Sequence, residues 1–142
     1  ENKSVVCAFE LISEKLEDYS RGEIKLTAQH HGAATFTKMI TRDDGKVNWQ
    51  SPAQSIYNQL RAFTPWPGLW TIFKDRRLKI ISLAPTSQPT IGPGKSGLIS
   101  NHLVIGAADF NMELRTVQIE GKKIVDASDF IKGYAHFINY QF

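Results

Sequence analysis

Residues 61–73 read Arg-Ala-Phe-Thr-Pro-Trp-Pro-Gly-Leu-Trp-Thr-Ile-Phe, and this stretch marks a change from helix to sheet. Ser51 followed by Pro52 predicts an N-cap and a first helical turn upstream of it, and apolar residues then recur at helical spacing. The two prolines of the stretch lack the amide hydrogen that a continuing helix needs. We therefore predict a helix over residues 51–63, followed by extended chain.

Short apolar runs alternate with turns beyond this point. Residues 69–73 and 78–83 flank Lys-Asp-Arg-Arg, which predicts a β-hairpin. Residues 85–94 contain three prolines and two glycines, so we predict a loop there. Three further runs are predicted to be strands, at residues 97–100, 102–106 and 112–119. About five short strands separated by loops indicate a small barrel or sandwich.

Helices are predicted near both ends of the chain. Apolar residues from Val5 to Tyr19 recur at spacings of three and four, opposite charged residues, and Gly22 ends the pattern. Nothing nearby in the sequence can cover this apolar stripe, so we expect a helix cut from the edge of a preceding domain. The absent initiator Met also suggests a longer protein. Residues 126–128, Asp-Ala-Ser, are predicted to cap the last helix. One face of that helix carries Phe130, Ile131, Tyr134 and Phe137.

Residues 23–37 are polar and small and show no period, which predicts a linker. We therefore divide the chain into residues 1–22 as the end of a preceding domain, residues 23–37 as the linker, and residues 38–142 as one domain.

Composition and charge narrow the classes of protein. The chain has 142 residues, 42% of them hydrophobic and 22% charged, which indicates a folded domain. No apolar run approaches the roughly 18–20 residues that span a bilayer, so we expect no membrane span. The net charge of +3 divides into −2 over residues 1–33 and +5 over residues 34–142. This bias favours a polyanionic partner, although an ordinary solvated surface is the alternative.

The single cysteine excludes an intrachain disulfide and fits a reducing compartment. Cys7 lies among Val, Ala and Phe, so we expect a small buried apolar residue rather than a reactive thiol.

The sequence offers no catalytic or metal-ligating constellation. His30 and His31 are adjacent and lack nearby ligands, so we interpret them as a solvated pair. Residues 92–97 resemble a phosphate-binding loop, but Pro93 removes one of the amides that such a loop needs and no helix follows. We therefore predict neither catalytic residues nor a metal site in this chain.

Cationic side chains near turns form the remaining candidate site. As a set on one face they would bind nucleic acid electrostatically. The predicted contacts are Arg42, Lys46, Arg61, Lys74, Arg76, Arg77, Lys79, Lys122 and Lys123. For Arg61, contact with phosphate and interaction with a helix C-terminus are equally acceptable interpretations. Three tryptophans, Trp49, Trp66 and Trp70, either close the core or stack on bases, and we favour the core.

Residues 47–49, 51–53 and 61–68 together resemble the C-terminal domain of methionyl-tRNA formyltransferases. In that family an Ile-Asp-Trp step precedes a helix ending in Arg-Ala-Phe-Asn-Pro-Trp-Pro-Gly. Asn48 and Thr64 depart from the usual Asp and Asn, and the fold prediction does not depend on these two positions. The resemblance extends from about residue 5 to the C-terminus and includes the Gly-Lys-Lys step at residues 121–123.

The resemblance implies a mainly β, OB-like small barrel of about five to six short strands, with flanking helices and preceded by an amphipathic helix and linker. It implies that the parent enzyme transfers a formyl group from 10-formyltetrahydrofolate to initiator methionyl-tRNA. The catalytic motifs belong to a Rossmann-like N-terminal domain and are not in this chain. We therefore expect a tRNA-binding chain without a bound cofactor or activity of its own. Lys122 and Lys123 are the strongest candidates for phosphate contact.

Further implications concern location and rival functions. We expect a monomer in a bacterial cytoplasm rather than in a mitochondrial matrix. The alternatives are a related formyltransferase or formyltetrahydrofolate hydrolase, a free-standing OB module for single-stranded nucleic acid, and a protein-docking domain.

Overall fold

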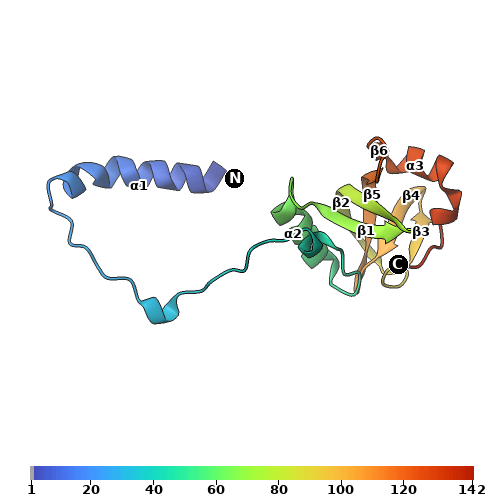
Figure 1. Cartoon of the computed structure of the whole chain (residues 1–142), viewed down its shortest axis with the longest axis horizontal. Helices are drawn as coiled ribbons and strands as arrows, with labels where there is room; N and C mark the ends of the chain where they lie inside the picture. Colours follow the sequence, from blue (N-terminus) through green and yellow to red (C-terminus); the bar gives the residue numbers. More distant parts are fainter. Residues whose placement is uncertain (1) are drawn as a thin grey trace. The chain divides into compact units, whose positions relative to one another are not determined.

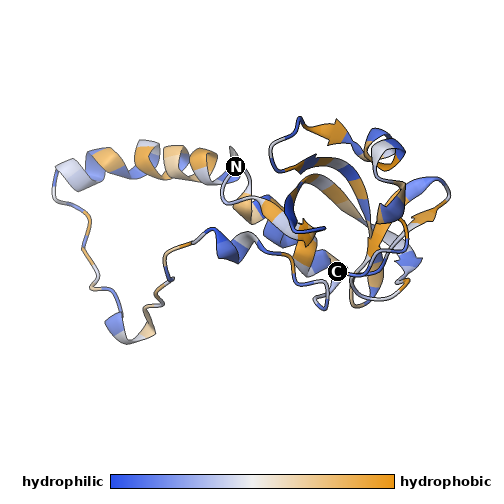
Figure 2. Ribbon diagram, turned by 45° about the vertical axis from the view of Figure 1, so that its right-hand side comes forward, coloured by the Kyte–Doolittle hydropathy of each residue, from blue (hydrophilic) through white to orange (hydrophobic). Residues whose placement is uncertain are grey.

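The computed structural model describes residues 2–142, and these form two compact units, one reaching to Lys38 and one beginning at Met39 (Figure 1). The first unit contains α1 (Asn2–Ser20) and a short 3₁₀ helix, η1 (His31–Ala33), in otherwise extended chain. The amphipathic N-terminal helix is thus confirmed. Figure 2 shows hydrophobic residues recurring along α1, and their side chains are exposed: Phe9 retains 71% of its accessible surface. Cys7 is also exposed, so the prediction that it is buried is wrong for this chain.

The second unit is built on an antiparallel sheet. Its strands run in the order β1-β2-β5-β4-β3, and β6 pairs with β5. Their bounds are β1 (Leu69–Phe73), β2 (Arg76–Pro89), β3 (Ser96–Ile99), β4 (His102–Gly106), β5 (Phe110–Ile119) and β6 (Val125–Asp126). Across the described residues the sheet has six strands and is open, which is consistent with an OB-like fold. The prediction of a mainly β domain with flanking helices is confirmed.

The helix α2 (Ala53–Phe63) packs against β1, β2 and β5 through Ile56 and Leu60. Its N-cap position is Pro52, and the side chain of Ser51 makes no capping bond, so the predicted cap is wrong. Asp109 replaces it: the Ala53 amide donates to Asp109 Oδ1 at 2.8 Å. This bond, with a second from the Phe110 amide, holds the pKa of Asp109 below its ordinary value, although partial desolvation opposes the shift.

The hairpin predicted around residues 74–77 is confirmed. Lys74 and Asp75 form its two-residue turn with φ of 47° and 61°, as a turn that matches the strand twist requires. Strand β2 then continues to Pro89, so the loop predicted from residue 85 is wrong over its first five residues. Pairing there is irregular, with Pro85 opposite Met112 and Pro89 opposite Phe110. Proline is accepted in a strand where the ladder does not need its missing amide.

The C-terminal helix α3 (Ala127–Gly133) is shorter than the sequence pattern predicted, because Tyr134 leaves helical geometry and η3 (Ala135–Phe137) follows. In Figure 1, α2 and α3 lie at different ends of the sheet. The core that they cover includes an aromatic cluster around Phe73, whose ring centroid lies 4.9 Å from those of Phe137 and Tyr140. The hydroxyl of Ser96 donates to the Phe137 carbonyl and fixes the C-terminal segment to β3.

Candidate nucleic-acid interface

Trp70 on β1 organises the cations predicted to bind nucleic acid. It is only 6% exposed, and its indole Nε1 donates to the Arg42 carbonyl at 3.0 Å. The Arg77 Cζ lies 4.5 Å from the indole centroid and the Lys46 Nζ lies 6.0 Å from it. These separations are in the range of cation–π attraction. A buried aromatic ring therefore holds two of the nine predicted cations close together.

Sheet register explains why these residues meet. In an antiparallel pair, opposite residues share one face of the sheet. Trp70 is opposite Lys79, and Arg77, two residues earlier on β2, is the diagonal neighbour of Trp70. Lys79 is in turn opposite Gln118 on β5. We call this surface the Trp70 face and define it by Lys46, Trp70, Arg77, Lys79, Gln118 and Glu120.

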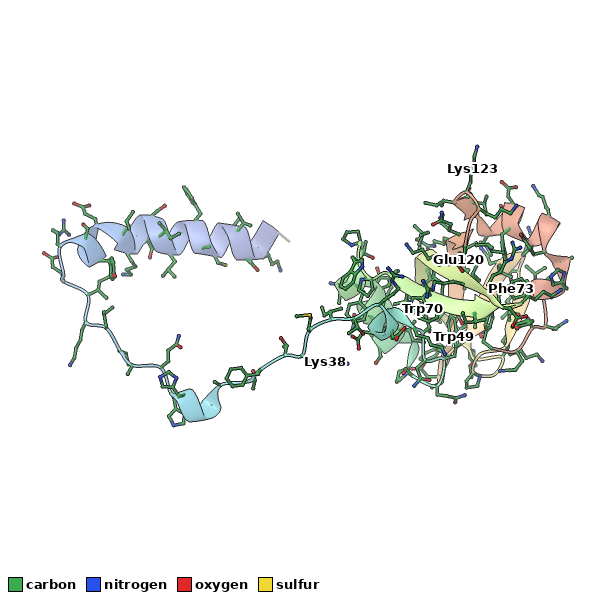
Figure 3. The ribbon with its side chains drawn as sticks, viewed as in Figure 1. Lys38, Trp49, Trp70, Phe73, Glu120 and Lys123 are labelled. Carbon is green, nitrogen blue, oxygen red and sulfur yellow. The ribbon has the colours of Figure 1, made fainter. Side chains whose placement is uncertain are left out.

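The turn after β5 adjoins this face. Gln118 Nε2 donates to the Lys122 carbonyl at 2.9 Å, and the Lys122 amide donates to the Ile119 carbonyl at 2.9 Å. The side chains of Lys122 and Lys123 are exposed. Figure 3 shows Lys123 projecting from the end of the fold, beyond Glu120. Lys122 is therefore tied to the Trp70 face through its backbone, whereas Lys123 extends away from the fold.

The structure does not gather all nine cations. Lys74 lies in the hairpin turn, and Arg76 begins β2 at its exposed end. Arg61 lies in the last turn of α2, with its Cζ 5.9 Å from the Tyr57 ring centroid. Its position fits both the helix-terminus and the phosphate interpretations. Arg42 contributes its carbonyl to Trp70, while its side chain is exposed.

Carboxylate pairing separates these cations from others in the same unit. Arg115 and Lys132 each lie within 4.0 Å of an acid, Glu113 and Asp129 respectively. The bond with Asp129 raises the pKa of Lys132. Within residues 2–142, none of the nine predicted cations has such an ion pair; Lys95 is likewise without one. Although Glu120 lies on the Trp70 face, no cation of that face forms an ion pair with a carboxylate of the described residues.

The three tryptophans differ in environment. Trp49 belongs to the buried core cluster, as predicted, and its ring centroid lies 6.0 Å from that of Phe142. Trp70 is also buried but lies outside that cluster, under Arg77 and Lys46. Trp66 is 58% exposed and does not close the core. Because Trp70 is enclosed, it holds cations instead of offering a ring on which a base could stack.

Sequence reasoning did not identify Gln118 and Glu120. They line a hollow of about 130 Å³ together with Arg77, Lys79 and Gly121. The spacing of residues 77 and 79 indicates that both lie on one face of a strand. Their neighbours on β5 are set by the pairing of Lys79 with Gln118, and these two residues are 39 positions apart in the sequence. No local pattern reveals such a pairing.

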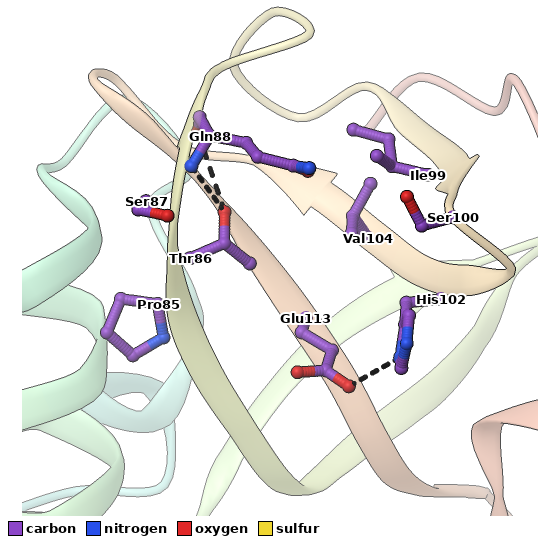
Figure 4. A pocket seen from close by; sticks show the side chains of 9 residues that line it. All are labelled: Pro85, Thr86, Ser87, Gln88, Ile99, Ser100, His102, Val104 and Glu113. Atoms are coloured by element: carbon purple, nitrogen blue, oxygen red, sulfur yellow. Dashed lines mark hydrogen bonds and ion pairs between the residues drawn. The ribbon is translucent and has the colours of Figure 1, made fainter.

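A second hollow is lined by residues of β2, β3, β4 and β5 and was also not predicted (Figure 4). It has a volume of about 290 Å³. Glu113 points across it, with Oε1 2.9 Å from His102 Nδ1 and Oε2 3.5 Å from Arg115. Because its central carboxylate already has two partners, this hollow lacks the unpaired charge of the Trp70 face.

Over residues 2–142, no group of three or more His, Cys, Asp or Glu side chains is placed to hold a metal ion. Nor does any helix in that range have the length and apolar character to cross a bilayer.

These observations define a mainly β domain with a basic face whose cations form no ion pairs within the described residues. Residues 39–135 match the model of the family described as formyl transferase, C-terminal domain, and the chain belongs to this family.

Its relatives include proteins named methionyl-tRNA formyltransferase. The one from Dehalococcoides mccartyi is 37% identical over 114 residues, covering 77% of this chain and 36% of that protein. The one from Corynebacterium diphtheriae is 32% identical over 124 residues, covering 87% of this chain and 40% of that protein. The chain thus spans about two fifths of the length of the curated relatives it matches.

Among solved structures, HypX from Aquifex aeolicus in complex with tetrahydrofolic acid has a similar fold. The TM-score is 0.62 at 16% identity, covering 91% of this chain and 23% of that chain.

Proposed function

We propose that this chain is the tRNA-binding C-terminal part of a methionyl-tRNA formyltransferase. The observation that carries the proposal is the pair of cations, Arg77 and Lys46, that lie on Trp70 and have no ion-pair partner among residues 2–142. The family and the names of the relatives favour initiator methionyl-tRNA as the polyanion.

The contribution of the chain to formyl transfer would be positional. Cations on the Trp70 face and the adjacent turn contact the phosphate backbone, which fixes the register of the tRNA without reading its sequence. The methionyl amine is then held where a catalytic domain presents the formyl group of 10-formyltetrahydrofolate. The chain itself would hold no cofactor and would not catalyse the transfer alone.

The proposal extends to the organisation of the parent protein. Residues 1–22 would be the last helix of a Rossmann-like catalytic domain, residues 23–37 the connector and residues 38–142 the tRNA-binding domain. The exposed apolar residues of α1, such as Phe9 and Leu16, support this assignment because they need a covering partner. We place the protein in the bacterial cytoplasm because the named relatives are bacterial. A monomer remains part of the proposal.

Fluorescence anisotropy with folded initiator tRNA and an unstructured oligonucleotide of equal length tests this function. We expect salt-dependent binding with a preference for the folded tRNA. We call the slope of the logarithm of the binding constant against the logarithm of the salt concentration the salt slope. Changing Lys122 and Lys123 together to Ala should weaken binding and reduce the magnitude of this slope by roughly two units. Preference for the unstructured strand would instead indicate a single-strand module, and no binding to either would indicate a protein-docking domain.

A further inference from the structure

The hollow between β2 and β5 combines two cations with an acid that neither of them pairs with. It is lined by Arg77, Lys79, Gln118, Glu120 and Gly121, and we call it the β2–β5 notch. Its volume of about 130 Å³ equals the space of about four water molecules. We propose that this notch binds one backbone phosphate of RNA through Arg77 and Lys79 jointly, and that Glu120 limits the affinity. This inference rests on the proposed function.

Arg77 lies against Trp70 in the chain without any ligand. Its guanidinium lies on the Trp70 ring, and its Nε is enclosed without an acceptor. Its terminal nitrogens are not among the buried unpaired atoms of the described residues, and no carboxylate pairs with them. A guanidinium that packs on a ring but forms no ion pair retains donors for an external anion, and its planar fork suits phosphate oxygens.

Lys79 brings a second cation to the same hollow. It follows Arg77 by two residues, so both side chains lie on one face of β2, and both line the notch. Gln118, opposite Lys79, holds the turn by donating to the Lys122 carbonyl. Gly121, in the turn after β5, has φ of 76°. A Cβ atom added to it would have no atom of the described residues within 4 Å outside its chain neighbours. The rim of the notch is therefore open on this side.

Glu120 opposes an anion in the notch. Its Oε2 lies 3.5 Å from the Arg77 backbone amide, yet it forms no ion pair with the Arg77 or Lys79 side chain. A carboxylate and a phosphate in one hollow repel each other. Removing the negative charge of Glu120 should therefore raise the affinity for RNA. The increase should exceed that caused by removing one negative charge elsewhere on the domain.

The salt slope counts the phosphates that these cations contact. With residues 1–142 and initiator tRNA, we expect Arg77→Ala and Lys79→Ala each to weaken binding about tenfold and to reduce the slope by about one unit. Because both cations serve one phosphate, the double variant should also lose about one unit, and its fold-loss should be smaller than the product of the single losses. A loss of about two units with multiplicative effects would overturn the notch as a single-phosphate site.

Two comparisons separate a local effect from a change in net charge. Glu120→Gln should raise tRNA affinity several-fold, whereas Asp129→Asn, which removes the same charge beside Lys132, should change it less. Lys132→Ala is the matched control for the cation changes, because its ammonium is already paired with Asp129. Equal effects of Glu120→Gln and Asp129→Asn would overturn the role of Glu120.

Inorganic phosphate distinguishes failure of the notch from failure of the tRNA-binding function. We expect phosphate to shift the NMR signals of the Gly121 amide and the Gln118 side-chain amide in the unmodified chain, but not in the Arg77→Ala, Lys79→Ala double variant. Shifts with phosphate but no binding of tRNA would refute the proposed function alone. Binding of tRNA without phosphate shifts at these positions would refute the notch alone.

Discussion

Trp70 contributes to the basic face without carrying a charge. Its ring holds Arg77 at 4.5 Å, and its Nε1 donates to the Arg42 carbonyl. Both Trp70→Phe and Trp70→Leu remove the donor, which should cost about 1 kcal/mol of unfolding free energy. Only Leu also removes the aromatic face under the guanidinium.

We therefore expect Trp70→Leu to bind RNA about two- to fivefold more weakly than Trp70→Phe, since cation–π attraction amounts to about 0.5–1 kcal/mol. The salt slopes should be equal, because no charge is lost. Anisotropy titrations at several salt concentrations measure both quantities. Indistinguishable affinities of the two variants would show that the ring does not position Arg77.

Asp109 joins two segments that are distant in the sequence, because its carboxylate accepts from the first amide of α2. Its folded pKa is lowered by that bond, so its stabilising contribution is complete above the ordinary value of 3.8 and is lost as the pH falls through the lower, folded pKa. We expect Asp109→Asn to lower the melting temperature at pH 7. The difference from the unmodified chain should shrink as the pH is lowered toward about 2.

Asp126 provides the control for this experiment. It occupies the N-cap position of α3 but makes no side-chain capping bond. Asp126→Asn should therefore change the melting temperature little at any pH. A pH-independent difference for Asp109→Asn would show that its charge does not stabilise α2.

At the scale of elements, Gly106 sets how closely β4 approaches the loop at residues 92–95. The Gly94 amide donates to the Gly106 carbonyl at 2.8 Å, and the Gly106 amide donates to the Lys95 carbonyl at 2.9 Å. A Cβ at Gly106 would lie 2.1 Å from the Gly92 carbonyl oxygen. Gly106→Ala must therefore push backbone away from backbone and break this contact.

We expect Gly106→Ala to lower the free energy of unfolding by about 3 kcal/mol, at the upper end of overpacking effects, in a denaturant titration. The same substitution at Gly133 is the matched control. A Cβ there would meet no described atom within 4 Å, and Ala should stabilise the last turn of α3 by about 0.5 kcal/mol. Equal stabilities of the two variants would contradict the close approach at Gly106.

The elements that the sequence could predict are those whose cause is local. The helix over residues 53–63 follows from its apolar spacing, and the hairpin turn at residues 74–75 from the flanking apolar runs. The start of α2 could not be predicted, because its cap comes from Asp109, 56 residues beyond Ala53. Likewise, residues 85–89 resemble a loop locally and become strand only through pairing with β5.

The same distinction applies to the candidate site. Cation-rich turns are visible in the sequence, and Lys79 and Arg77 could be placed on one face from their spacing. The sequence does not reveal that Trp70 lies under Arg77, or that Gln118 and Glu120 complete the notch, because these contacts depend on strand register. Nor does it show that Arg61 lies apart, over Tyr57.

At the scale of the whole molecule, charge and core divide between the two units. Residues 39–142 carry twelve Lys and Arg against eight acids, a balance of +4, whereas residues 1–38 carry five against six, a balance of −1. All nine predicted cations lie in the second unit, and so does the buried core, from Val47 to Phe137. Stability and polyanion binding should therefore both belong to residues 39–142.

We accordingly expect a chain of residues 39–142 to melt within a few degrees of the full chain and to bind initiator tRNA with the same salt slope. Its affinity should be equal or slightly higher at low salt, because a unit with a net negative charge has been removed. Calorimetry and salt-dependent anisotropy on both chains measure these quantities. A smaller slope for residues 39–142 would mean that cations before residue 39, such as Lys25, contact the RNA. The basic face would then be only part of the interface.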